Sequence, residues 1–211
     1  MSADIEAGAA GPCPSGPVPD SAAICSFLKI IGQGLHLCSI VTDGGGRVHG
    51  RWFGDDIAAA TDWAVTENNM GKNLYWTVNL VAEGCNKKPG KVDIVAARFV
   101  HVDIDPPKGG GELDKVMTQA ELKALSVPPS LIVDSGGGLQ AFWRLDGPAP
   151  TAEIEAVNRN IADRFGGDNC HNIDRLMRLP GTLNYPNAKK RAAGRTTSLA
   201  RVIYDTDRIL N

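Results

Sequence analysis

ARFVHVDID, residues 97–105, is the stretch from which both the fold and a candidate site of this chain can be worked out. Apolar residues at positions 100, 102 and 104 alternate with His101, Asp103 and Asp105, which is the period of a strand with one buried face. Successive strand side chains point to opposite faces, so the two carboxylates share one face, roughly 6–7 Å apart along the strand. Such a pair repels unless cations compensate it, and it suits Mg²⁺ or Mn²⁺. The simpler interpretation is a strand that ends in an acidic turn, because Asp-Pro often begins a turn.

The segments after this strand predict a ferredoxin-like unit over residues 96–205. Their order is strand, helix, strand, strand, helix, and then a strand or short helix, which is the order of a split βαβ motif. Helices are expected on one face of its sheet, which leaves the other face to hold a site. Thr151 is the expected N-cap of the second helix. The expected elements are a helix over 117–126, strands over 130–134 and 139–145, a helix over 151–165, the segment 173–179, and a last strand over 198–204.

The residues before this unit predict a smaller α/β unit over 21–95. A hairpin is indicated by two strand-like runs around Asp43-Gly44-Gly45-Gly46. Residues 1–20 are rich in Gly, Pro, Ala and Ser and are expected to be flexible. The predicted fold class is therefore α/β of the α+β kind, with a mixed, mainly antiparallel sheet and one domain over 21–211. The other expected elements are helices over 21–33 and 55–68 and a strand over 73–81.

Composition excludes several classes of protein. The five cysteines form no CxxC pair and are odd in number, which argues against a zinc finger and a disulfide framework and fits a reducing cytoplasm. No stretch approaches the ~20 apolar residues of a membrane span, and the N-terminus lacks the pattern of a secretory signal. A formal net charge of −2 argues against a chain that coats DNA nonspecifically, although a local basic groove can still bind phosphates.

A glycine turn, Ser135-Gly136-Gly137-Gly138, joins the two strands over 130–145. It fits a plain hairpin turn, and it equally fits a backbone cradle for a triphosphate, because glycines let amide groups approach an anion closely. Gln140 alternates with apolar Leu139 and Ala141, so its side chain can reach the same site.

A third segment, GGDNCHNIDRLMRLPGTLN at 166–184, combines acids with arginines. Asp168 fits a solvated acid after a helix end, and Asp174 fits the cap of a short turn that presents the two arginines. Arg175 and Arg178 fit structural ion pairs or a clamp for substrate phosphates.

These three segments, taken in order, resemble the archaeo-eukaryotic primase superfamily, and most of all the primase-polymerases of plasmids and phages, including the RepB type. The resemblance covers about residues 70–190 and rests on VDIDP, SGGGLQAFW and GGD…DRLMRLPGTLN. It implies that the family's acid pair falls on Asp103 and Asp105 and its third metal acid on Asp168, with Asp174 as second choice. The chain departs from the family at Gln140, where a histidine that touches the nucleotide phosphates is expected; glutamine donates a hydrogen bond but carries no charge.

The resemblance further implies template-directed nucleotidyl transfer with two divalent cations, Mg²⁺ or Mn²⁺. Its substrates would be nucleoside triphosphates, deoxy or ribo, a single-stranded DNA template and a primer 3′-end, with a helicase in the same replication system and no membrane. The implied nucleotide-binding residues are Ser135, Gly136, Gly137, Gly138, Gln140, Arg178 and Asn184, with Arg175 and Lys91 as further candidates. Lys87, Lys88 and Lys91 are candidates for template or phosphate contacts, although a solvated loop is the favoured interpretation of this segment.

Two other functions compete with this interpretation. A noncatalytic replication-initiation or nucleic-acid-binding module with a degenerate primase fold would explain the departure at Gln140. A relaxase-like nicking enzyme would need a histidine cluster and a tyrosine nucleophile, whereas the four histidines are scattered at 36, 49, 101 and 171.

Overall fold

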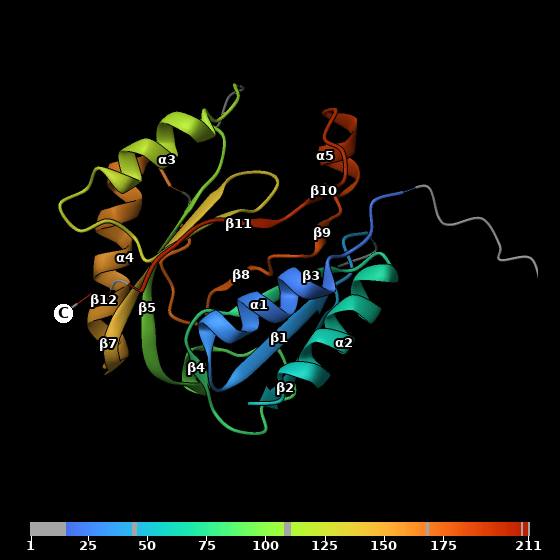
Figure 1. Ribbon diagram of the computed structural model, residues 1–211, viewed down its shortest axis with the longest axis horizontal. Helices are drawn as coiled ribbons and strands as arrows, with labels where there is room; N and C mark the ends of the chain where they lie inside the picture. Colours follow the sequence, from blue (N-terminus) through green and yellow to red (C-terminus); the bar gives the residue numbers. More distant parts are fainter. Residues whose placement is uncertain (1–15, 44–45, 108–110, 168, 208, 211) are drawn as a thin grey trace, which may run out of the picture.

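The computed structural model describes residues 16–43, 46–107, 111–167, 169–207 and 209–210. Most of the segment expected to be flexible, 1–15, lies outside these ranges, as do the hairpin glycines Gly44 and Gly45. The architecture is mixed α+β, with two large, mainly antiparallel sheets and one two-stranded sheet among the described residues, and it confirms the predicted fold class (Figure 1).

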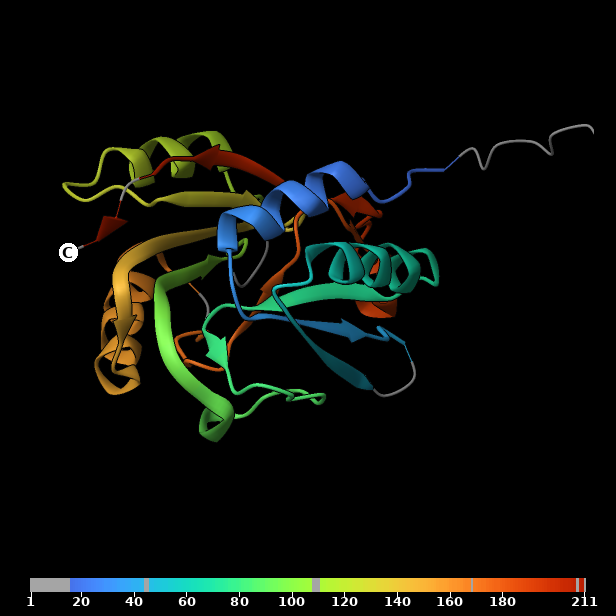
Figure 2. The same ribbon diagram turned by 60° about the horizontal axis from the view of Figure 1, so that its bottom comes forward.

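The first half of the chain supplies two helices and three strands of a four-stranded sheet of order β2-β1-β3-β8, whose last strand, β8 Leu176–Arg178, comes from the second half. Both helices begin at an aspartate whose carboxylate accepts an N–H from the first turn: Asp20 from Ala23 and Asp56 from Ala59. Figure 2 shows α1 lying between α2 and β11, so this helix contacts both halves of the molecule. The elements are α1 Ser21–Ile31, β1 Leu35–Ile40, β2 Val48–Gly54, α2 Ile57–Asn69 and β3 Asn73–Thr77.

The second half builds the larger sheet, of order β11-β6-β7-β5-β4. The neighbours β5, β7 and β6 are antiparallel, which is the core order of a ferredoxin-like unit. The short strand β12, Ile209–Leu210, lies parallel to β7. The other elements are β4 Leu80–Val81, the 3₁₀ turn η1 Lys91–Asp93, β5 Ile94–Ile104, α3 Lys115–Lys123, β6 Leu131–Asp134, β7 Leu139–Ala149, α4 Thr151–Phe165 and β11 Arg201–Asp205.

Two hydrophobic cores hold these layers together. One lies between the two sheets, where Trp76 of β3 packs at 5.2–5.7 Å, ring centre to ring centre, against Phe27, Phe99 and Phe142. The other lies on the far face of the large sheet, against α3 and α4, and includes Val102. Residues 102 and 104 of β5 therefore point to the second core, as their alternation predicted, and Asp103 faces the first sheet.

Two expectations are corrected by the structure. The strand in segment 173–179, β8 Leu176–Arg178, does not join the ferredoxin-like sheet but pairs antiparallel with β3 of the first sheet. A hydrogen bond holds β8 at this edge of the first sheet, because the Val78 N–H, at the end of β3, donates to the Arg175 C=O, just before β8, at 3.1 Å. Thr151 is not an N-cap but the first helical residue of α4, after Pro150, which has no side-chain acceptor.

After β8 the chain forms a stem that projects from the two large sheets, and it then returns to the larger sheet as β11 (Figure 1). The stem strands β9 Leu183–Asn184 and β10 Ser198–Leu199 pair antiparallel, and the short helix α5 Ala188–Ala192 lies between them. Across the part of the chain that the structure describes, no helix is both long and apolar enough to span a bilayer.

Candidate active site

Asp103 lies on β5 at the seam between the two sheets, directly opposite Gln140 of β7. Gln140 donates from Nε2 to Asp103 Oδ1 at 3.2 Å, and Nη2 of Arg175 lies 3.8 Å from Oδ2. The Asp103 side chain is only 14% exposed, so these two partners act on a largely desolvated carboxylate.

Gln140 also connects Asp103 to β8 of the other sheet. Its Oε1 accepts the backbone N–H of Arg178 at 3.1 Å. Arg178 in turn donates from Nη2 to Tyr75 Oη at 2.8 Å and to Asn184 Oδ1 at 3.0 Å, and its guanidinium lies 4.2 Å from the centre of the Tyr75 ring. The fold thus gathers Asp103, Gln140, Arg178 and Asn184 from four strands, as well as Tyr75.

Tyr75 is the member that sequence reasoning missed. It alternates with buried Leu74 and Trp76, which places its ring on the opposite face of β3. This alternation points to Arg178 only when β3 is known to pair with β8, because Tyr75 then lies opposite Arg178.

Two buried guanidinium nitrogens beside Asp103 have no hydrogen-bond partner among the residues that are described: Nη1 of Arg178 and Nε of Arg175. Burial lowers the pKa of Arg178, while Tyr75 and Asp103 act in the opposite direction and favour the charged form. A buried N–H without an acceptor is costly, and a phosphate oxygen is the acceptor that best suits a guanidinium. These atoms therefore point to an anionic ligand next to the acid pair.

The glycine turn contacts the acid strand directly. A Cβ on Gly138 would collide with the carbonyl oxygen of Ile104 and lie 2.7 Å from Asp105 Oδ1, so only glycine fits there. Gly136 adopts φ +86°, a left-handed conformation that glycine tolerates. The amides of Gly136 and Gly138 donate within the turn, to Asp134 Oδ1 and Ser135 Oγ. Of the two interpretations, hairpin turn or cradle, the geometry favours a turn that brings Asp105 close.

The predicted metal ligands are only partly described. Asp103 and Asp105 supply hard carboxylate oxygens, the donors that Mg²⁺ and Mn²⁺ prefer. Asp168 lies outside the described residues, and no cluster of three metal-binding side chains occurs among those inside. Asp174 accepts from Asn172 Nδ2 at 2.7 Å, as expected for a turn residue. The donor set of the acid pair fits a divalent cation.

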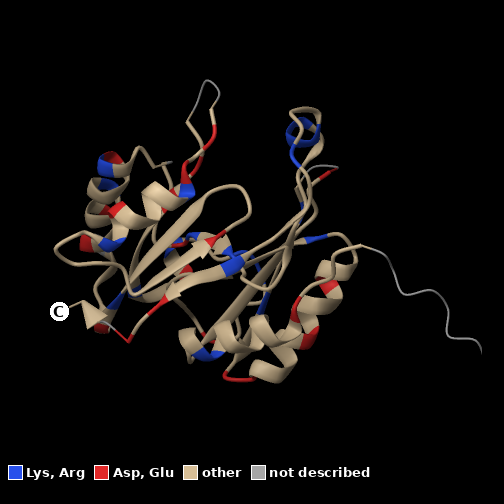
Figure 3. Ribbon diagram, turned by 45° about the horizontal axis from the view of Figure 1, so that its top comes forward, with Lys and Arg blue, Asp and Glu red and all other residues tan. Residues whose placement is uncertain are grey.

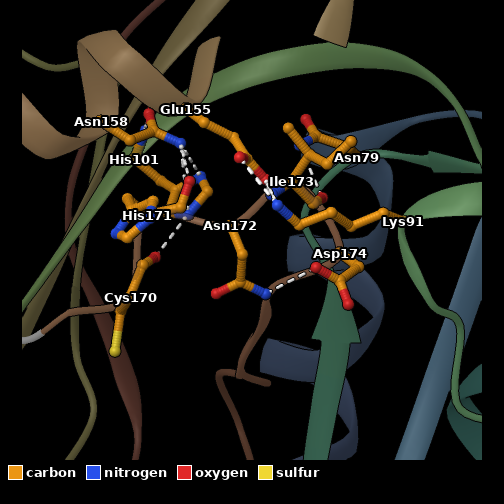
Figure 4. Close-up of polar contacts among 10 residues, drawn as sticks. All are labelled: Asn79, Lys91, His101, Glu155, Asn158, Cys170, His171, Asn172, Ile173 and Asp174. Carbon is orange, nitrogen blue, oxygen red and sulfur yellow. Dashed lines mark hydrogen bonds and ion pairs between the residues drawn. The ribbon is translucent and has the colours of Figure 1, made fainter. Parts of the chain in front are cut away.

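A buried hydrogen-bond network fixes the segment that leads from α4 to β8 (Figure 4). His101, fully buried on β5, contacts Cys170 C=O through Nε2 at 3.0 Å. Asn158 of α4 accepts the His101 N–H at 2.9 Å and donates to His171 C=O at 3.1 Å. Because a carbonyl only accepts, the proton of the neutral ring is on Nε2; burial lowers the pKa of His101 to about 4.

The same segment is held at its other end by two more side chains. Glu155 accepts the Ile173 N–H at 3.1 Å, and Asn79 donates to Ile173 C=O at 2.9 Å. We call residues 170–175 the clamped segment. It positions Arg175 beside Asp103, and it begins two residues after Asp168.

Two of the three predicted lysines form ion pairs with acids other than Asp103. Lys91 forms an ion pair with Glu155 at 2.7 Å, and Lys87 forms one with Asp93 at 3.0 Å (Figure 4 shows the Lys91 pair). Lys88 is exposed. These contacts favour the solvated-loop interpretation over a role at the site.

No family model matches the chain, and no curated protein matches its sequence. The solved structures that are similar to it include the following three. The crystal structure of primase RepB' has a TM-score of 0.63 at 18% identity, over 90% of this chain and 57% of that one. The catalytic domain of primase RepB' in complex with initiator DNA has a TM-score of 0.64 at 17% identity, over 90% and 86%. The primase-polymerase domain of cyanophage S-2L has a TM-score of 0.65 at 16% identity, over 92% and 95%.

The chain spans little more than half of the full RepB' structure and nearly all of the phage catalytic domain. At these identities the likeness concerns the fold. The chain therefore has the fold of the archaeo-eukaryotic primase-polymerases.

Proposed function

We propose that this chain is a primase-polymerase catalytic domain that carries out template-directed nucleotidyl transfer in plasmid or phage replication. The observation that carries the proposal is the contact chain Asp103–Gln140–Arg178, which joins a desolvated carboxylate to a buried arginine at the seam of a primase-polymerase fold. We further propose a single domain over 21–211, with a cytoplasmic location and a helicase in the same replication system.

Asp103 and Asp105, completed by Asp168, would hold two Mg²⁺ or Mn²⁺ ions. When bound, such ions lower the pKa of a primer 3′-hydroxyl and neutralise the leaving pyrophosphate. The chain's own residues bind and orient the substrate. Arg178 and Arg175 each have a buried N–H group without a partner among the described residues, and these groups would take phosphate oxygens of the incoming nucleotide.

Gln140 has a positioning role in this proposal. Its amide holds the Asp103 carboxylate through Nε2 and the backbone of Arg178 through Oε1, so one side chain sets the spacing between the two. Asn184 ties Arg178 to the glycine turn, because it accepts from Arg178 and donates to Ser135 C=O at 2.8 Å.

The test is primer synthesis and extension on a single-stranded template, with deoxy- or ribonucleotides and with Mg²⁺ or Mn²⁺. Wild-type protein should give template-dependent product, and Asp103→Asn and Asp105→Asn should give none while keeping the wild-type urea midpoint. Asp62→Asn, which removes an exposed acid of α2, is the matched control and should retain activity. Absence of product from wild-type protein under all four conditions would refute the proposal.

One observation favours a second function, a noncatalytic nucleic-acid-binding module. Gln140 donates to Asp103 and Arg175 lies 3.8 Å from its Oδ2, so the protein's own residues offset part of the charge of this carboxylate. This alternative predicts that the protein binds DNA, that it incorporates no nucleotide, and that DNA binding persists in Asp103→Asn.

A further inference from the structure

Positive charge is concentrated in one part of this chain. Between Asp174 and Asp205 there is no acidic residue, although the whole protein has a formal net charge of −2. Such separation creates a local positive potential on a nearly neutral molecule. The basic residues of this stretch are Arg175, Arg178, Lys189, Lys190, Arg191, Arg195 and Arg201.

Four of these basic residues lie on the structure that projects beyond the β9–β10 stem. We call residues 187–195 the basic arm; Figure 3 shows its helix in blue. Every residue from Asn187 to Gly194 is exposed. Asp43 holds the helix of the arm, because it accepts from Arg191 Nη2 at 2.8 Å and from the Ala188 N–H at 3.2 Å.

Three cations of the arm have no ion pair with any residue in the described ranges: Lys189, Lys190 and Arg195. Four other lysines of the described residues do form ion pairs: Lys72, Lys87, Lys91 and Lys115. The arm therefore presents charges that folding does not use.

The base of the arm borders a polar pocket of about 490 Å³. Lys190 and Arg195 line it on the arm side, and Gly136 and Gly137 line it on the side of the glycine turn. Nη1 of Arg195 lies 2.8 Å from where a Cβ on Gly137 would be, so the guanidinium packs against the turn. The next glycine of that turn touches Asp105. The pocket thus lies between the arm and the acid pair.

We propose that the basic arm binds the phosphodiester backbone of a nucleic-acid strand and guides it toward Asp103 and Asp105. The inference rests on the proposed function only in naming the ligand as a nucleic acid. No aromatic residue occurs from 186 to 203, so the arm offers no stacking platform for bases. Its binding is electrostatic, independent of base sequence, and weakened by salt through the release of counterions.

The test measures fluorescence anisotropy of a labelled oligothymidylate between about 50 and 200 mM NaCl, in EDTA and without nucleotides, a salt range over which phosphate contacts weaken strongly. The arm variant is Lys189→Ala/Lys190→Ala/Arg195→Ala. Each lost phosphate contact lowers the slope of log K against log salt by about 0.7, so the slope should fall by about 2 and the affinity at low salt by roughly tenfold or more. A mixed-sequence strand should give the same result.

The matched control removes three exposed cations elsewhere, Lys29→Ala/Lys123→Ala/Arg159→Ala. It has the same net charge as the arm variant and should keep the wild-type slope; the urea midpoints of both variants verify folding. An unchanged slope in the arm variant, equal losses in both variants, or no binding of the strand by wild-type protein would each overturn the inference.

Two further measurements distinguish strand binding by the arm from nucleotide binding by the arm and from the catalytic proposal. In the first, the binding assay is repeated with a labelled nucleoside triphosphate and Mn²⁺ in place of the labelled strand. If the arm variant loses affinity for the nucleotide but not for the strand, the arm binds the triphosphate and the inference fails. Asp103→Asn should bind the strand as wild type does, so failure of catalysis leaves the arm untouched and failure of the arm leaves the catalytic proposal standing.

Discussion

The two connections on either side of β8 are built in opposite ways. The clamped segment, 170–175, lacks regular structure, yet side chains from β5, α4 and the end of β3 hold its backbone in place. The basic arm, 187–195, contains a helix, yet it is exposed throughout most of its length and held at Asp43. One fixes Arg175 beside a carboxylate; the other presents cations to solvent.

The difference separates two electrostatic tasks. Holding metals and a triphosphate needs charges at fixed positions, because misplacement by about 1 Å costs about 10²-fold in rate. Binding a polyanion by counterion release needs charge density but no fixed geometry. Removing a buried contact of the clamped segment should therefore lower the free energy of unfolding strongly, whereas removing an exposed contact of the arm should change it little.

The largest effect is expected from Asn158→Ala. It removes the partners of the His101 N–H and of the His171 C=O, both of which are buried or nearly so, and should lower the free energy of unfolding by about 2–4 kcal/mol. Urea denaturation measures this loss. Asn160→Ala, at an exposed position of the same helix, is the control and should stay within about 0.5 kcal/mol of wild type. Equal midpoints for the two variants would show that the segment is not clamped.

Gly138→Ala should come next, at about 2–3 kcal/mol, because its Cβ collides with Ile104 C=O and crowds Asp105. Primer extension should fall as well, since the collision displaces the acid pair. The control is Gly147→Ala, on the strand that follows the turn, where open space surrounds the glycine; it should leave both stability and extension unchanged. Full activity in Gly138→Ala would argue against close packing of the turn on the acids.

Acidification should weaken the clamp through His101. The folded protein holds the neutral ring, with a pKa of about 4, whereas the unfolded chain has a pKa near 6.5. Since the unfolded state binds more protons, this stabilisation is complete above pH 6.5 and is lost as the pH falls toward 4; between pH 7 and 5 the loss is about 2 kcal/mol.

The groups that bear on the ring are Arg175 and His171, whose charges also lower its pKa. His101→Gln removes the titration, so the difference in unfolding free energy between the two proteins isolates it. A difference that does not change between pH 7 and 5 would contradict the buried neutral histidine.

The smallest effect is expected from Asp43→Ala in the arm. The Asp43–Arg191 pair is exposed, so its loss should leave the urea midpoint unchanged within error. It should raise affinity for oligothymidylate slightly, because it frees Arg191 and removes a negative charge beside the arm. Asp146→Ala removes an exposed acid on β7 and should not raise the affinity. A clear loss of stability in Asp43→Ala would mean that the arm is held more firmly than its contacts indicate.

The features that could be predicted from the sequence are those set by a local pattern of residues. The alternation in 97–105 identified β5 and the face that carries Asp103, and glycines 136–138 identified the turn. The pairing of β8 with β3 was not predicted from the sequence, because a short apolar strand can pair with an edge of either sheet. The observed edge is fixed by hydrogen bonds from Asn79 and Val78 to Ile173 and Arg175, about one hundred residues later in the chain. Tyr75 and the requirement for Gly138 were hidden for the same reason, since each depends on a neighbour that only the fold supplies.

The crossing of β8 into the first sheet has a consequence for synthesis of the chain. Tyr75 and Arg178, which meet across β3 and β8, are 103 positions apart. Until β8 emerges from the ribosome, β3 has an unpaired edge, and unpaired edges invite association with other chains. Contacts over such sequence separations also form late and slowly. Arg178 therefore reaches Gln140 only after most of the protein has been made, which means that a truncated product is left without the completed site.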